Sequence, residues 1–293
     1  MNGSGVRRPV VVGVDRSEAN HWAVRWASDE AAWRGLPLLM LHAQDWPVGT
    51  PPEPGPDHPA HRWAIGLRAA GDTLLESARL TATERHPDLE ITARLVEGRP
   101  VHVLREAADG AAQLVLGIRR LTEAHSALPI GSTGASLVGH LPCPVALVPE
   151  PVPDVSGGGP VVVGVDGSAA SEAAIGFAFE EASLGGVDLQ AVEVRRPKEA
   201  EWPELVETAL ADLGEALAGW REKYPDMRVR HEVLTGDPAR MLAIAAARAR
   251  CLVIGSRGLG GFRGMLLGST GRALVHRCTS PLVIVPSGSR SAA

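Results

Sequence analysis

Short apolar runs alternate with longer amphipathic stretches along the chain. The run PVVVGVD is followed by a stretch of helical period that Ser17 is expected to cap and Gly35 to end. Four further apolar runs follow, LPLLMLHA, LEITARLVEG, AQLVLGI and PVALVP, and helical stretches separate them. Strands that alternate with helices are typical of a parallel sheet covered by helices on both faces. The pattern predicts five strands and four helices up to residue 149.

The second half of the chain repeats the first. VVVGVDRSEANHWAVRWASDEAA from Val10 returns as VVVGVDGSAASEAAIGFAFEEAS from Val161, and GSTGASLVGHLPCPVALVP returns as GSTGRALVHRCTSPLVIVP. The segment between the copies is rich in proline and glycine, as linkers are. We therefore expect a first domain at 1–149, a linker at 150–159 and a second domain at 160–293. Each domain is expected to be a doubly wound, five-stranded α/β unit of Rossmann-like type.

The composition of the chain mainly argues against certain partners, locations and cysteine roles. The chain has 293 residues, of which 45% are hydrophobic and 22% charged, as in ordinary soluble domains. Its net charge of −5 argues against nucleic acid or an anionic membrane as a partner. The first apolar run ends at Asp15, too early for a signal peptide, so a cytoplasmic protein is expected. Cys143, Cys251 and Cys278 form no CxxC pair and are expected to be structural thiols.

The loops after the first and fourth strands are the candidate binding site of each copy, because ligands of open parallel sheets bind where the strand order reverses. In the second copy Asp166 follows the first strand, and the glycine-rich stretch 255–270 follows the fourth. That stretch ends at Ser269 and Thr270, where a helix is expected to begin. Glycines let backbone N–H groups turn inward, and a helix N-terminus favours an anion. The stretch, which also carries Arg257 and Arg263, is therefore expected to bind phosphate.

Common catalytic and phosphate motifs do not occur in the sequence. No GxxxxGK[ST] is present, so a P-loop NTPase is not supported, and no GxGxxG follows the first strand, so a Rossmann dinucleotide site is not supported either. The histidines show no HxH or HExxH spacing, so we predict neither a metal site nor a catalytic residue. Trp22, Trp26 and Trp33 recur at nearly helical spacing and are expected to pack in the core or between domains.

The chain resembles the universal stress protein family in its tandem-domain bacterial form. The resemblance rests on VVVGVDGS, on Gly255-x-x-Gly258 followed nine residues later by Gly268-Ser269, and on the closing SPLVIVP. It covers nearly the whole chain. It implies a fold like that of the adenine nucleotide alpha hydrolases and ATP as the ligand. In the family's ATP-binding members the aspartate lies near the ribose, the second strand near adenine, and the glycine loop on the phosphates.

The resemblance can be carried over residue by residue. In the second copy it implies a nucleotide site made of Gly164, Val165, Asp166, Val194, Ile254, Gly255, Arg257, Gly258, Gly268, Ser269 and Thr270. In the first copy the matching residues are Gly13, Val14, Asp15, Ala43, Leu116, Gly117, Arg119, Gly131, Ser132 and Thr133. The first copy departs from the pattern, because Arg120 replaces the second glycine and Glu123 adds negative charge. Whether it binds nucleotide stays open, and weaker or altered binding is expected if it does.

We therefore expect an ATP-binding regulator of the stress response that acts by binding and not by fast catalysis, with Mg²⁺ left open as a bridge between phosphates. Two alternatives remain: a slow ATP hydrolase or phosphoryl-transfer enzyme that uses the same site, and a nucleotide-free dimerisation scaffold. For Asp15 and Asp166 a purely local role as helix caps is a further alternative. The resemblance also implies that the last strands of the two copies pair, and homodimerisation is left open.

Overall fold

The computed structural model describes residues 7–46, 54–119, 132–152, 159–196, 202–258 and 267–288. The first half contains β1 (Val10–Gly13), α1 (Ala19–Arg34), β2 (Leu38–Gln44), α2 (His61–Arg85), β3 (Ile91–Glu97), α3 (Pro100–Asp109), β4 (Gln113–Arg119), α4 (Ser132–Leu137) and β5 (Val145–Glu150). The second half contains β6 (Val161–Val165), α5 (Ala169–Gly185), β7 (Leu189–Arg195), α6 (Trp202–Lys223), β8 (Val229–Thr235), α7 (Pro238–Ala245), β9 (Cys251–Gly255), α8 (Ser269–Arg277) and β10 (Leu282–Val285). The described part of each half follows the predicted alternation of strands and helices.

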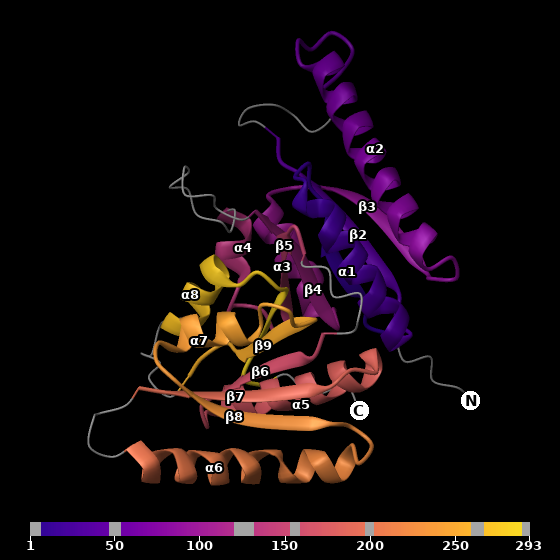
Figure 1. The fold of residues 1–293 in the computed structure, drawn as a ribbon. Coiled ribbons are helices and arrows are strands. Elements are labelled where there is room, and N and C mark those ends of the chain that lie inside the picture. The colour runs from indigo at the N-terminus through magenta and orange to yellow at the C-terminus, as the bar shows by residue number, and fades with distance from the viewer. Residues whose placement is uncertain are drawn as a thin grey trace.

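All of these strands form one sheet, in the order β3-β2-β1-β4-β5-β10-β9-β6-β7-β8 (Figure 1). Neighbours within each half are parallel, whereas β5 and β10 are antiparallel, with Ala146 opposite Val283. This pairing of the last strands covers an edge that each half would otherwise expose. Within each half the strand order reverses between the first and fourth strands, β1 and β4 or β6 and β9, which is where a crevice is expected.

Helices cover both faces of the sheet, because successive side chains of a strand point to opposite sides. Val10 and Val12 belong to the core on the side of α1, α2, α5 and α6. Val11 belongs to the core on the side of α3, α4, α7 and α8. Phe179 of α5 is fully buried, and burying a side chain of this size contributes about 1.5–3 kcal/mol. The predicted α/β class, with helices on both faces, is confirmed.

The ends of α1 test two predictions about its caps. Gly35 ends the helix in the left-handed conformation, with φ of 60°, as predicted. The prediction that Ser17 caps α1 is wrong, because Glu18 occupies the N-cap position and no side chain caps the helix. The Ser17 hydroxyl donates to Oδ1 of Asp15 at 2.5 Å. Asp15 thereby closes the turn before the helix and does not cap it.

The tryptophans and cysteines occupy packed positions. Trp26 of α1 is buried in the core, as predicted for a core position. Trp33 lies under the guanidinium of Arg250 from the other half, as predicted for a contact between the domains. All three cysteines are buried and form no disulfide, and burial raises the pKa of the Cys143 thiol to about 12. Among the helices that the structure describes, every one is too short or too polar to cross a bilayer.

Candidate functional site

A cavity of about 410 Å³ opens beside the carboxyl ends of β6 and β9. Segments that are far apart in the sequence form its walls: the ends of β6, β7 and β9, and the first turns of α7 and α8. Every residue predicted for the second-domain site lines it: Gly164, Val165, Asp166, Val194, Ile254, Gly255, Arg257, Gly258, Gly268, Ser269 and Thr270. The fold therefore brings the loop after β6 and the loop after β9 to one place.

One wall of the cavity is apolar. Val192 and Val194 of β7 contribute to it, together with Pro238 and Leu242 of α7 and Ile254 of β9. The sequence analysis did not include Val192, although its spacing of two from Val194 places both on the same face of a strand. It also did not include α7, which begins after β8 with a proline at its start. The lining residues missed by sequence reasoning are Ser171, Val192, Pro238, Leu242, Ser256, Gly271 and Arg272.

A second wall is polar and positively charged. It contains the first turn of α8, where a helix leaves N–H groups without intrahelical partners and carries about half a positive charge. Arg257 and Arg272 also line the cavity, and Arg257 donates to the Ser287 hydroxyl at 3.0 Å. Asp166 is the one acidic side chain among the lining residues. An amphiphilic ligand with a flat apolar part and an anionic part fits such a pair of walls.

Ser168 connects the two loops of the site. Its hydroxyl oxygen accepts from the N–H of Ser171 at 3.2 Å, which caps α5, and its O–H donates to the carbonyl oxygen of Arg257 at 3.2 Å. Oδ1 of Asp166 accepts from the N–H of Ser168 at 3.0 Å. The N-cap of α5 is thus Ser168 and not Asp166, so the capping alternative does not account for the aspartate.

The glycines of the site have different physical roles. A β-carbon at Gly258 would overlap Oδ2 of Asp166, so the absence of a side chain lets this loop approach the carboxylate. A β-carbon at Gly255 would lie 2.6 Å from the backbone of Ala170, so this glycine is needed where α5 begins against β9. A β-carbon at Gly268 would meet only the Gly258 N–H, at 3.8 Å, which is an ordinary contact.

Glu193 is a buried carboxyl close to the site, between Val192 and Val194 on β7. Burial raises its pKa, and the charges of Asp212 and Asp166 act in the same direction. Arg195 opposes the shift through an ion pair at 2.5 Å. Glu193 does not line the cavity, so we assign it no part in binding.

The first-copy residues occupy the corresponding ends of strands. Gly13 ends β1 and precedes Val14 and Asp15, Ala43 lies in β2, Leu116, Gly117 and Arg119 lie in β4, and Ser132 and Thr133 begin α4. Gly131, Arg120 and Glu123 lie outside the described residues. In the second copy the same holds for Gly260, Gly261, Arg263 and Gly264. Whether the described residues of the first copy form a nucleotide site therefore stays a prediction.

The fold and the cavity define a class of protein: two α/β units that share one open sheet, with a ligand-sized cavity where the strand order of the second unit reverses. The model of the universal stress protein family matches residues 7–149 and again residues 159–286. The chain belongs to this family, and each half is one copy of its domain.

Whole-length relatives share the tandem arrangement. A universal stress protein of Mycobacterium tuberculosis is 36% identical over 291 residues, which cover 94% of this chain and 96% of that protein. One of Mycolicibacterium smegmatis is 35% identical over 292 residues, with the same coverage of 94% and 96%. The crystal structure of a universal stress protein from Archaeoglobus fulgidus superposes with a TM-score of 0.69 at 15% identity, over 94% of this chain and 96% of that chain. This last likeness concerns the fold alone.

Proposed function

We propose that the second copy binds ATP in the cavity between β6 and β9, and that the protein regulates a stress response through this binding. One observation carries the proposal. The residues predicted from the glycine pattern and from Asp166 line a single cavity of about 410 Å³, with one apolar and one cationic wall. Cavities of this size are in the range that holds small ligands and cofactors.

The two walls suggest how the nucleotide lies. Adenine packs on Val192, Val194 and Leu242, where its flat apolar face removes those side chains from water. The phosphates lie at the start of α8, because its N–H groups and Arg257 favour negative charge. Asp166 accepts from the ribose hydroxyls, since a carboxylate beside bare phosphates would repel them.

Mg²⁺ enters this proposal only with the nucleotide. The described residues contain no group of three or more His, Cys, Asp or Glu side chains that could hold a metal ion. Mg²⁺ keeps much of its water and is often held through substrate phosphates and one or two carboxylates. When bound to ATP it would neutralise part of the phosphate charge. Asp166 is the carboxylate that lines the same cavity.

The lining residues favour binding over turnover. Asp166 is the one side chain among them of a type that commonly acts as a general base, and the proposed pose uses it for the ribose. Binding alone can carry a signal, because a ligand present at 100 times its Kd stabilises the bound form by about 2.7 kcal/mol. The surface beside the cavity would then differ between the free and the bound protein.

The test is calorimetric titration of the full chain with ATP, with ADP formation followed in the same samples. Gly258→Asp places a side chain and a negative charge against Asp166, so binding is expected to be lost. Gly219→Asp makes the same chemical change on α6, where a β-carbon meets open space, and is expected to bind as the wild type does. The proposal is wrong if the wild type takes up no ATP at millimolar concentration, or if both variants bind equally. Release of ADP at a steady rate, beyond one equivalent per protein, would identify a hydrolase instead.

A further inference from the structure

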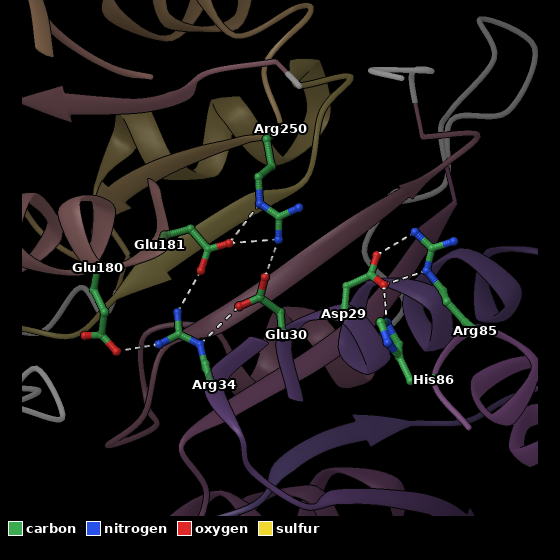
Figure 2. Close-up of polar contacts among 8 residues, drawn as sticks. All are labelled: Asp29, Glu30, Arg34, Arg85, His86, Glu180, Glu181 and Arg250. Atoms are coloured by element: carbon green, nitrogen blue, oxygen red, sulfur yellow. Dashed lines mark hydrogen bonds and ion pairs between the residues drawn. The ribbon is translucent and has the colours of Figure 1, made fainter. Parts of the chain in front are cut away.

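Two glutamates from equivalent positions of the repeat meet at the junction between the copies. Glu30 lies in α1 and Glu181 in α5, and each has 1% of its surface exposed. Figure 2 shows their carboxyl groups facing each other, with the guanidinium groups of Arg34 and Arg250 on either side. Arg34 comes from the first copy, and Arg250 from the residue before β9 in the second.

The two arginines each contact both glutamates. Arg34 donates from Nε to Oε2 of Glu30 at 3.2 Å and from Nη2 to Oε2 of Glu181 at 2.7 Å. Arg250 donates from Nη2 to Oε1 of Glu30 at 2.6 Å and from Nε to Oε1 of Glu181 at 3.0 Å. Every oxygen of the two carboxyl groups therefore has a guanidinium donor, and each arginine holds one copy to the other.

Aromatic rings pack against the two arginines of the cluster. The guanidinium carbon of Arg250 lies 3.8 Å from the ring centroid of Trp33 and 4.7 Å from that of Trp26. The guanidinium carbon of Arg34 lies 5.0 Å from the ring centroid of Phe177. Rings at these distances attract the cations and lower the local dielectric, which strengthens every charge interaction inside the cluster.

The facing carboxyl groups of Glu30 and Glu181 are both buried (Figure 2). Two carboxylates that share a buried site repel each other, which favours a proton on one of them. Glu180 also forms an ion pair with Arg34, from Oε1 to Nη1 at 2.6 Å, but its side chain is 17% exposed. Burial and the charge of Glu181 raise the pKa of Glu30 to about 8. Burial acts to raise the pKa of Glu181 as well. The charge of Arg250, a hydrogen bond from Glu30, and the charge of Arg34 outweigh burial and lower this pKa.

The other titratable groups described near the cluster contact different partners. Asp29, the neighbour of Glu30 in α1, accepts from Arg85 at 2.5 and 2.8 Å and contacts Nε2 of His86 at 2.7 Å (Figure 2). Arg85 and His86, at the end of α2, thus contact a carboxyl group outside the facing pair. On β9, Cys251 is fully buried, and burial and the nearby glutamate charges raise the pKa of its thiol.

We propose that Glu30 and Glu181 hold one proton between them at neutral pH, and that the contact between the two copies weakens as rising pH makes this proton harder to keep. Loss of the proton would leave two negative charges facing each other in a buried site. Because the same four side chains hold α1 against α5, the cost falls on the contact between the copies. The junction is a pH-responsive joint, and this inference does not depend on nucleotide binding.

The direction of the effect follows from the proton count. In the unfolded chain both glutamates ionise near their ordinary value of 4.5. Between that pH and about 8 the folded protein holds one more proton than the unfolded chain, so the pair's contribution to stability falls as pH rises and levels off above about 8. For a difference of one proton the unfolding equilibrium constant rises about tenfold per pH unit.

The test is urea unfolding of the full chain between pH 5.5 and pH 9. Glu30→Gln keeps a neutral side chain that can donate to Glu181, so its urea midpoint is expected to lose this fall with pH and to exceed that of the wild type at pH 8. Glu181→Gln removes the shared proton in the same way and provides a second comparison. Glu180→Gln is the matched control: it removes one ion pair of Arg34 but keeps the facing pair, so it is expected to keep the wild-type dependence on pH.

A difference in midpoint between wild type and Glu30→Gln that stays constant across this pH range overturns the proposal. So does a Glu180→Gln profile that flattens as much as that of Glu30→Gln. Should neither Glu30→Gln nor Glu181→Gln fold, the wild-type profile decides: a midpoint that falls from pH 5.5 to pH 8 supports the shared proton, and a level or rising midpoint overturns it.

Discussion

Gly255 lies against the backbone of Ala170, so close that a β-carbon on the glycine would stand 2.6 Å from the alanine's carbonyl group. The first copy contains the same contact between Gly117 and Ala19, at 2.9 Å. In both copies the fourth strand ends where the first helix begins, and a side chain at this position would separate the two. Gly255 and Gly117 are therefore needed for the packing of the fourth strand against the first helix, whether or not a ligand binds nearby.

Gly255→Ala should destabilise the second domain. The added methyl group meets backbone atoms that cannot rotate away, and overpacking of this kind costs about 1–3 kcal/mol. Urea or thermal unfolding measures the loss. Gly214→Ala is the matched control, because a β-carbon on Gly214 in α6 meets nothing within 4 Å and alanine favours a helix by up to about 1 kcal/mol. Equal stability of the two variants would contradict the packing role.

Gly258→Ala should reduce nucleotide affinity and leave stability nearly unchanged. The β-carbon would displace the Asp166 carboxylate, a side chain that can move, so the free energy of unfolding should change by less than about 0.5 kcal/mol. A displaced carboxylate loses its ribose contact, and a loss of about 1.4 kcal/mol weakens binding tenfold. Calorimetric titration with ATP measures this change. A variant that binds ATP as tightly as the wild type would show that Asp166 has no part in the site.

Ser168→Ala should cost about 1 kcal/mol of stability, because it removes the N-cap of α5. It also removes the bond to the carbonyl oxygen of Arg257, so nucleotide affinity should fall as well. The equivalent change in the first copy, Ser17→Ala, removes no cap and should cost less than about 0.5 kcal/mol. Unfolding curves of the two variants provide the comparison, and equal losses would mean that the cap contributes nothing specific.

Thiol reagents should not modify the native protein at pH 8. Burial raises the pKa of Cys143 to about 12 and that of Cys251 well above its usual value, and the thiolate is the reactive form. A colorimetric thiol reagent should therefore detect almost no thiol before unfolding and three after the addition of urea. Rapid reaction of one thiol in the native state would show that a buried cysteine becomes exposed by local opening.

The class of fold could be predicted from the sequence because its cause is local. Apolar runs such as PVVVGVD form buried strands wherever helices of suitable length separate them, and the repeat from Val10 to Val161 doubles the result. The residues around the cavity could also be predicted, since the strand order of such sheets brings Asp166 and the loop from Gly255 to one edge. Their binding of ATP stays a prediction until it is measured.

The sequence alone determined the repeat, the alternation of strands and helices, and part of the set of residues that line the second-copy cavity. Only the tertiary structure decided which serine caps a helix, which glycine is required for packing, and that Glu30 faces Glu181. These three features depend on how closely separate elements approach one another, either within one copy or across the junction of the copies. A pattern along the chain predicts which face of its helix or strand a residue occupies. Which residue of another element packs against it is decided by the tertiary structure.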